Sequence, residues 1–276
     1  MTDRSISRTR SGSLIPVLAI LLVGGMVLLA GCARKTELFP PGMHPRAQDV
    51  WERFESGGEL EPSFSALDLS ASLNYSGPGR KGRVVLHFWG NLNYPLRLDV
   101  RTGLGPIVAY CREDAGGFLA YVPSRKSAWL FPDGKMGMAA FGVELPFTLK
   151  QLGLILAGRA GEVFPEGYAS ATLVPEQGFE YVFFEELKPA KVLVDFFSRP
   201  LRWTGAGEIP WRIEFGRYKD TQDSLPVRLK FFRGEVLRAI LSVKDAELLD
   251  VPWDEKQMEL AVPRGVPIRL GSSHDS

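Results

Sequence analysis

Few side chains in this sequence have the types and spacing that chemistry requires. The three histidines, His44, His87 and His274, show no metal-ligand spacing, and no nucleophile motif accompanies them. Two pairs of adjacent carboxylates, Glu113-Asp114 and Glu185-Glu186, each stand at the end of a predicted strand, where a solvated, charged turn is the usual arrangement. The sequence therefore predicts no enzyme, no metal site and no cofactor.

Cys32 is the residue whose surroundings predict a covalent modification. It follows a polar, basic segment at residues 1–13 and an apolar run from Leu14 to Leu29. That run has about 16 residues, fewer than the roughly 20 that span a bilayer. A charged segment, an apolar run and small residues in this order are typical of a secretory signal peptide.

The four residues Leu29-Ala30-Gly31-Cys32 resemble the lipobox of bacterial lipoproteins. This resemblance implies a signal peptide over residues 1–31, cleavage before Cys32, and acylation of Cys32 with two or three chains such as palmitate, which hold a protein at a membrane almost permanently. Ala33 follows in place of the Asp that favours the inner membrane, so it points to the periplasmic face of the outer membrane. The alternative is an uncleaved signal anchor with an incidental cysteine.

The composition is that of a globular protein with nearly balanced charge. Apolar residues make up 45% of the chain and charged residues 24%, which argues against disorder. The chain has 33 Lys and Arg against 32 Asp and Glu, so it lacks the basic excess typical of nucleic-acid binding. The remaining thiol, Cys111, lies in an apolar run at 107–111 and is predicted to be a buried core residue rather than a nucleophile.

Alternating apolar and polar residues predict an antiparallel sheet with few helices. Residues 67–75 and 96–101 alternate cleanly, whereas 84–89 is apolar on both sides. Apolar residues spaced by three and four predict one helix after Pro45 and a short, almost wholly apolar helix over 147–157. Further strands are predicted at 107–112, 118–122, 127–131, 168–174, 179–185, 191–197, 201–204, 211–218, 225–232, 236–243 and 246–251.

No linker rich in Pro or Gly divides these strands, so we expect a single domain. We predict a tether over 32–44, a domain over 45–251, and a C-terminal tail over 252–276 that is partly disordered. The predicted fold class is mainly β (α+β), with a strongly curved antiparallel sheet, or open half-barrel, closed by a short helical lid.

The order of these elements resembles the LolA/LolB-like fold family, and within it the LolB-like outer-membrane lipoprotein receptors. The resemblance implies an open antiparallel half-barrel, closed by helices over an apolar cavity. The likeness rests on the lipobox and a following helix with Trp51, on Tyr94 to Leu98 with Gly103-Leu104-Gly105, on Leu145-Pro146 with the apolar helix before Gly158, and on Trp211 to Tyr218 with Leu225 to Leu229.

The resemblance also implies partners and a special loop. In LolB-like proteins a protruding loop ends in an exposed Leu that is implicated in passing cargo to the membrane, and Leu104 stands at the matching position. Its implied role is membrane delivery, and the alternative is a buried turn residue. The implied ligands are acylated lipoproteins or lipids, and a periplasmic LolA-like carrier is a candidate partner.

Such a role requires an apolar cavity, because each CH₂ group left in water costs about 0.8 kcal/mol. We expect the helix over 147–157 to cover the cavity and one face of the sheet to line it. Each lining residue has an alternative interpretation as ordinary core, and a register error of one residue inverts the face. The predicted lining residues are Leu86, Phe88, Leu98, Val100, Trp129, Leu149, Leu152, Leu156, Phe183, Val194, Ile213, Phe215, Leu229 and Phe231.

These observations favour an outer-membrane-anchored lipoprotein that binds acyl chains in an apolar cavity and assists their delivery to the membrane. The alternative is a structural or assembly lipoprotein with a packed core that acts through protein–protein contacts. An interior filled completely by side chains would favour the alternative.

Overall fold

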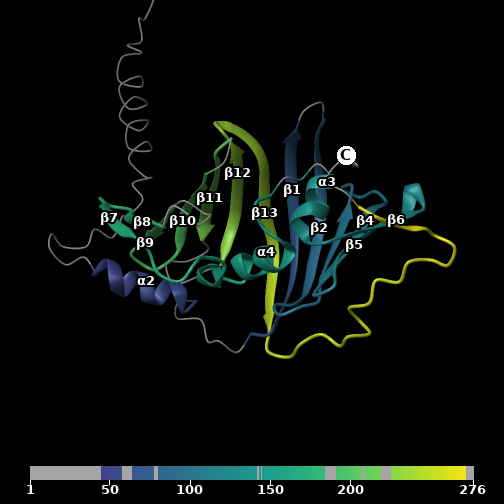
Figure 1. Ribbon diagram of the computed structural model, residues 1–276, viewed down its shortest axis with the longest axis horizontal. Helices are drawn as coiled ribbons and strands as arrows, with labels where there is room; N and C mark the ends of the chain where they lie inside the picture. Colours follow the sequence, from purple (N-terminus) through teal and green to yellow (C-terminus); the bar gives the residue numbers. More distant parts are fainter. Residues whose placement is uncertain are drawn as a thin grey trace, which may run out of the picture. The chain divides into compact units, whose positions relative to one another are not determined.

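Consecutive strands pair mostly as antiparallel neighbours and build one curved sheet (Figure 1). The computed structural model describes residues 45–57, 64–77, 80–141, 143, 145–183, 191–206, 209–218 and 225–271. Within these residues the sheet has 14 strands in the order β14-β6-β5-β4-β3-β2-β1-β13-β12-β11-β10-β9-β8-β7. The edge strands β14 and β7 do not pair with each other, so the sheet stays open. The predicted fold class, an open curved sheet with a helical lid, is confirmed.

The described residues all belong to one compact unit. The predicted signal peptide, Cys32 and the tether lie outside the described residues, as do Glu185-Glu186 and His274. None of the described helices is both long enough and apolar enough to cross a membrane.

The strands follow the alternating segments of the sequence closely. The predicted strands at 236–243 and 246–251 are one strand, β13, because a β-bulge at Lys244 absorbs the break in the alternation. The strand bounds are Ala66–Gly77 (β1), Arg80–Asn91 (β2), Leu96–Arg101 (β3), Ile107–Asp114 (β4), Gly117–Val122 (β5), Ser127–Phe131 (β6), Ser170–Val174 (β7), Gly178–Val182 (β8), Lys191–Asp195 (β9), Pro200–Gly205 (β10), Trp211–Tyr218 (β11), Pro226–Arg233 (β12), Val236–Leu249 (β13) and Ile268–Leu270 (β14).

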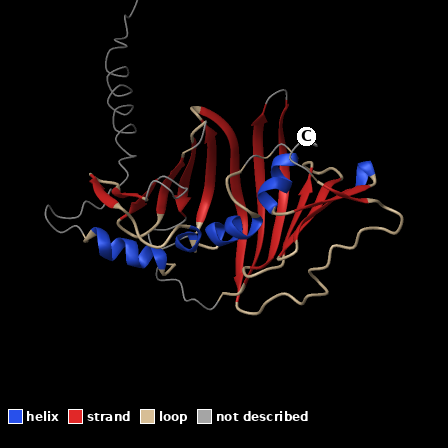
Figure 2. Cartoon of the chain, in the orientation of Figure 1, coloured by secondary structure: helices blue, strands red, loops and turns tan. Residues whose placement is uncertain are grey.

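Three α-helices lie along the same face of the sheet (Figure 2). They are α2 (Ala47–Glu55), α3 (Gly134–Ala140) and α4 (Leu149–Leu156), and two 3₁₀ turns accompany them, η1 (Pro123–Arg125) and η2 (Ala160–Val163). The helix α3 follows β6, and Asp133 caps its first turn by accepting a hydrogen bond from Met136 N at 2.8 Å. The helix α4 begins with a capping box formed by Thr148 and Gln151.

Aromatic packing covers the β7–β11 half of this face. Trp51 of α2 is almost fully buried, and its ring centroid lies 4.7 Å from that of Tyr181 on β8 and 5.7 Å from that of Phe183. Phe164, just after η2, stacks on Phe183, and its ring centroid lies 4.5 Å from that of Trp203 on β10. These rings fill the space between the helices and this part of the sheet, so it forms an ordinary core.

The chain beyond β13 packs against the sheet rather than leaving it. Met258 is fully buried, and the backbone of Trp253 exchanges two hydrogen bonds with the Asn91 side chain, at 2.7 and 3.2 Å. Further along, β14 pairs with β6 in parallel. The described part of the segment that we expected to be a tail, residues 252–271, therefore contributes to the core and to one edge of the sheet.

Candidate binding cavity

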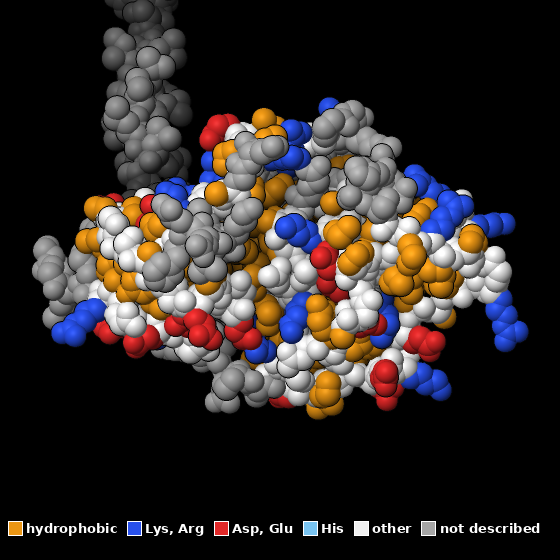
Figure 3. Space-filling model, viewed as in Figure 1, with side chains coloured by type: hydrophobic (Ala, Val, Ile, Leu, Met, Phe, Trp, Pro, Cys, Tyr) orange, Lys and Arg blue, Asp and Glu red, His pale blue; other side chains and the backbone are white. Residues whose placement is uncertain are grey.

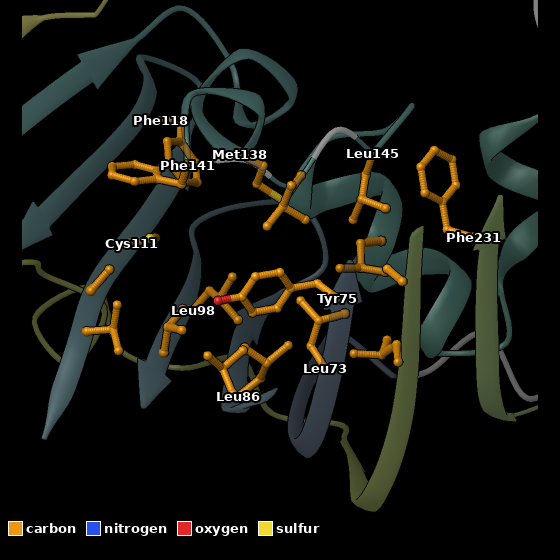
Figure 4. A pocket seen from close by; sticks show the side chains of 18 of the residues that line it. Leu73, Tyr75, Leu86, Leu98, Cys111, Phe118, Met138, Phe141, Leu145 and Phe231 are labelled. Carbon is orange, nitrogen blue, oxygen red and sulfur yellow. The ribbon is translucent and has the colours of Figure 1, made fainter. Parts of the chain in front are cut away.

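The face of the sheet that carries the helices is left partly open over β1–β5 and β11–β13, where it forms a cavity of about 370 Å³ (Figure 4). This volume is within the range of roughly 300–1,000 Å³ that is usual for small-molecule sites. The lining is apolar except for Tyr75, Ser124 and Arg125. It comprises Leu73, Tyr75, Val84, Leu86, Leu98, Val100, Val108, Ala109, Cys111, Phe118, Val122, Ser124, Arg125, Met138, Phe141, Val143, Leu145, Phe147, Leu152, Ile213, Leu229, Phe231, Ala239 and Leu241.

The cavity remains unfilled because the helices reach only part of the sheet. Gly153 of α4 sits close to Leu67 and Phe88, and a Cβ atom at this position would lie 3.5 Å from each side chain, so α4 closes the lower part of the β1–β2 region. Above it, the concave side chains of β1–β5 face Met138, Phe141, Val143, Leu145 and Phe147, which come from α3 and the chain between α3 and α4.

The cover differs in detail from the expected lid helix over 147–157. Of α4, only Leu152 lines the cavity, whereas Leu149 and Leu156 are buried in the core. The cover is formed chiefly by Met138 and Phe141, at the end of α3, and by the chain that leads into α4. The helical lid is therefore present, but its inner surface comes from the apolar, methionine-containing segment that precedes the predicted helix.

The predicted lining residues that belong to strands share one face of the sheet, and only part of that face lines the cavity. Residues directly opposite each other in paired strands share a face, and the register links Phe88 to Leu98 and Phe215 to Leu229. Every strand residue of the predicted set lies on the concave face by this criterion. Seven of the 14 predicted residues line the cavity: Leu86, Leu98, Val100, Leu152, Ile213, Leu229 and Phe231.

The other predicted residues lie where the helices or neighbouring rings cover the face. Phe88 lies beneath α4, Phe183 belongs to the aromatic core, and Trp129 packs edge-on against Phe141, with ring centroids 6.1 Å apart. Val194 and Phe215 are buried on strands of the covered half. The alternation of each strand predicts the face correctly, but it carries no information about which part of that face is covered.

Tyr75 lies across the middle of the cavity in Figure 4, between Leu98 and Leu73. Its hydroxyl approaches Gly82 on β2 so closely that a Cβ at this position would lie 2.8 Å from the Tyr75 oxygen. The glycine therefore gives the Tyr75 ring room to lie flat over the sheet. The ring lies across the cavity and is half-buried.

Cys111 supplies the thiol of the lining. It is buried, and burial raises the pKa of this thiol to about 12. The thiol therefore stays protonated at neutral pH and behaves as a small apolar side chain. This burial agrees with the prediction that Cys111 is a core residue rather than a nucleophile.

Glu113 holds the cover to the sheet. Its carboxylate on β4 accepts hydrogen bonds from Gly134 N of α3 at 3.0 Å, from Leu149 N of α4 at 2.5 Å and from Lys150 N at 3.3 Å. The N-termini of both helices thus meet one negative charge, which their dipoles favour. Burial raises the pKa of Glu113, and the three backbone donors oppose that rise.

The prediction that Glu113 lies in a solvated turn is wrong. Glu113 is only 1% exposed, whereas the neighbouring Asp114 points to the other face and pairs with Arg112. Adjacent residues of a strand point to opposite faces, so one member of the pair is buried and the other is not. The partners of Glu113 come from segments 21 and 36 residues further along the chain, which a local pattern does not reveal.

Leu104 is fully exposed in the connection between β3 and β4, so the alternative of a buried turn residue is wrong. Because neighbouring strands are antiparallel, this connection lies at the same ends of the strands as those between β1 and β2, β5 and β6, β10 and β11, and β12 and β13. We call this border of the sheet, which is formed by strand ends and is uppermost in Figure 1, the mouth edge. The exposed residues of the cavity lining, Val108, Ser124 and Arg125, all lie there, so the cavity opens at this edge.

The described histidine takes no part in the cavity. His87 lies on the other face of the sheet, where its Nε2 atom is 2.8 Å from Asp68 Oδ1 and its ring stacks on Trp89. Among the residues that the structure describes, no group of three or more His, Cys, Asp or Glu side chains is placed to hold a metal ion.

Comparison with protein-family models and with curated proteins finds no match. Solved structures do match. One, provisionally described as an outer membrane lipoprotein-sorting protein domain from Vibrio parahaemolyticus, has a TM-score of 0.51 and 10% identity, covering 77% of this chain and 97% of that chain. Another, a DUF1329 family protein from Desulfovibrio piger, has a TM-score of 0.53 and 10% identity, covering 77% of this chain and 95% of that chain.

A LolA superfamily protein from Nitrosomonas europaea also matches, with a TM-score of 0.44 and 13% identity, covering 75% of this chain and 96% of that chain. The first two similarities extend over almost the whole of the matched domains and concern the fold alone. The class that the architecture defines is an open half-barrel with a helical lid, the fold that this chain shares with the first two solved domains.

Proposed function

We propose that this protein is a lipid-anchored component of the bacterial outer membrane that binds acyl chains of lipoproteins or lipids in its cavity. It assists their delivery to the membrane, as a LolB-like receptor does. The observation that carries the proposal is the apolar cavity of about 370 Å³, open at the mouth edge of a LolA/LolB-like fold. In the alternative, a structural lipoprotein with a packed core, side chains would fill this space.

The binding free energy expected for an acyl chain in this cavity suits reversible binding. Burial of about ten to fourteen methylene groups contributes about 8–11 kcal/mol. Association costs at least about 4 kcal/mol. The difference of at most about 4–7 kcal/mol corresponds to dissociation constants of about 10 μM or weaker. A cargo held this weakly can pass to a bilayer, which offers it more apolar contact, without an energy source.

The proposal assigns binding and no catalysis. The ionisable groups of the lining are Tyr75, Cys111 and Arg125, and the thiol is held in its protonated form by burial. No acid and base pair faces the cavity among the described residues, and the buried carboxylate nearby, Glu113, is occupied by three backbone donors. Acylation of Cys32 supplies the anchor, and a periplasmic LolA-like carrier is the proposed donor.

Binding of a fluorescent fatty acid to residues 33–276, which contain the compact unit but not the anchor, tests the proposal. We expect one saturable site, displaced by an acylated peptide but not by the same peptide without its acyl chain. Lipid that copurifies with the protein, detected by mass spectrometry, would agree. Absence of saturable binding by a folded protein would contradict it.

The delivery role proposed for Leu104 has a separate test. Because Leu104 is fully exposed, Leu104→Glu should leave the free energy of unfolding within about 0.5 kcal/mol of its original value. Binding of the fluorescent fatty acid should also hold, while its transfer to liposomes slows. Transfer at the original rate would remove Leu104 from the delivery step.

A further inference from the structure

The cavity opens beside a cationic side chain. Of the described residues that line it, Arg125 alone carries a charge, and its neighbour Ser124 is polar. Both residues are exposed, and both belong to the 3₁₀ turn η1 at the mouth edge. The opening therefore presents a positive charge and a hydroxyl group above an apolar interior.

The turn that carries Arg125 is held in place by its own hydrogen bonds. Pro123 occupies the first position of η1, where its restricted φ suits the turn. The Ser127 hydroxyl donates a hydrogen bond to Arg125 O at 3.0 Å, and Lys126 N donates one to Pro123 O at 3.1 Å. Within the described part of the chain Arg125 forms no ion pair, so its guanidinium group is left to water or to a ligand.

Below the opening the lining becomes buried and apolar along two neighbouring strands. On β4, Val108 is 37% exposed and Cys111 is 4% exposed, and on β5, Val122 is 7% exposed and Phe118 is 1% exposed. A strand rises about 3.3 Å per residue, so the lining descends about 13 Å from Val122 to Phe118. Figure 4 shows Cys111 and Phe118 on the same side of the cavity. A hydrocarbon chain that enters at the opening would lie against apolar side chains over this depth.

The surface beside the opening is also basic. Lys126 follows Arg125 and is exposed. Figure 3 shows Lys and Arg side chains beside hydrophobic ones along the upper right border of the folded unit, in the region of β4 and β6 in Figure 1. Glu144, between the lining residues Val143 and Leu145, lies outside the described residues. A comparison of ligands by their charge therefore measures the net effect of all side chains at the opening.

We infer that the cavity holds one acyl chain of a lipid with an anionic headgroup, with the carboxylate or phosphate at Arg125 and Ser124 and the chain along β4 and β5. A guanidinium group binds carboxylates and phosphates through paired N–H donors, and a serine hydroxyl can donate one more hydrogen bond. A volume of about 370 Å³ is near the lower limit for small-molecule sites, so a single chain suits it better than several. Free fatty acids and monoacyl phospholipids share this chemistry.

This inference rests on the proposed function, because it names the class of ligand that the same cavity takes. It adds a requirement for charge and an orientation of the ligand, which acyl-chain binding alone does not need. Ligands that share one chain and differ in their headgroups therefore separate the two.

The test is isothermal titration calorimetry of residues 33–276 at neutral pH, with each ligand below its micelle concentration. Laurate and lauroyl lysophosphatidylglycerol are anionic, dodecyldimethylamine oxide is neutral, and dodecyltrimethylammonium is cationic. We expect at least one anionic ligand to bind about fivefold more tightly than the neutral one, as an exposed ion pair allows, and the cation to bind most weakly. High salt should remove this preference. The tighter of the two anionic ligands shows whether a carboxylate or a phosphate is preferred.

Two variants of Arg125 test its part in the preference. Arg125→Gln should lower the affinity for the preferred anionic ligand about fivefold and leave that for the amine oxide within about twofold. Arg125→Glu should reverse the preference, so that the cation binds more tightly than laurate. Both variants should melt at the original temperature, because Arg125 is exposed. The matched control, Arg101→Gln, removes an exposed charge from the mouth edge but not from the lining, and it should change neither affinity.

The outcomes distinguish the inference from the proposed function. Equal affinities for the anionic, neutral and cationic ligands would overturn the inference and leave acyl-chain binding in place. So would an Arg125→Gln variant that keeps the full preference for the anionic ligand. Absence of saturable binding of all four ligands by the folded protein would contradict the proposed function, and the inference with it.

Discussion

Replacement of Glu113 by alanine is expected to lower the free energy of unfolding by about 3–5 kcal/mol, because three backbone N–H groups lose their acceptor and two of these hydrogen bonds are buried. The corresponding fall in the melting temperature is about 10 °C for a chain of this size. Thermal and urea unfolding of residues 33–276 would measure both. The large effect follows from the position of Glu113, which joins β4 to the first turns of both α3 and α4.

Glu113→Ala should also loosen the cover of the cavity. Hydrogen exchange of the α3 and α4 amides should increase more than that of the central strands β1 and β13, because the two helices lose a common attachment. Fatty-acid affinity should fall as the cover becomes less well defined. Equal protection changes in the helices and in the central strands would show that Glu113 stabilises the fold as a whole and does not act on the cover.

Asp114→Ala is the matched control. Asp114 is the next residue on β4, but it points to the other face, where it is partly exposed and pairs with Arg112. A pair that water reaches contributes less than about 1 kcal/mol. We therefore expect a small change in stability and no selective change in the exchange of α3 or α4. Similar losses in the two variants would contradict the role assigned to Glu113.

The face of the sheet was predictable from the sequence because a strand has a period of two. Once Leu98 is taken as inward, Val100 follows, and pairing carries the same face to Leu86 and across the neighbouring strands. The β-bulge at Lys244 preserves this relation over the length of β13, although it breaks the alternation in sequence. Local alternation thus specifies the orientation of the side chains but not the number of strands.

The extent of the cavity was not predictable in the same way. Phe88 and Leu86 stand on one strand and one face, yet Phe88 lies under α4 while Leu86 lines the cavity. The difference depends on where a helix some 65 residues further along the chain comes to rest, which Gly153 permits by its close approach to Phe88. Glu113 is similar, because its burial depends on two helix N-termini that are distant in sequence.

The C-terminal segment shows the same limit. Its residues lack a clear alternation, so the sequence predicts a tail, yet Met258 is fully buried and β14 pairs with β6 about 140 residues earlier. Parallel pairing at an edge needs only three residues here, too few for a periodic signal. What the sequence lacks in each case is information on contacts between distant segments.

The second large effect is expected for Val84→Trp, which should weaken fatty-acid binding by roughly fiftyfold. Val84 lines the cavity from β2, beside Tyr75 and close to the mouth edge. An indole ring that displaces only about three methylene groups of the ligand removes about 2.4 kcal/mol of binding free energy, and this corresponds to that factor. Equilibrium titration with a fluorescent fatty acid would measure the loss.

Val85→Trp is the control that separates occupation of the cavity from the insertion of a large ring into β2. Val85 is the neighbouring residue, half-buried on the opposite face, and it does not line the cavity. Because Val84→Trp places its added volume in existing space, its unfolding free energy should stay within about 1 kcal/mol of the original. Val85→Trp should bind the fatty acid within about twofold of the original protein, less than the effect of one methylene group. If both variants bind it equally well while folded, acyl chains do not occupy this cavity, whatever the protein does at the membrane.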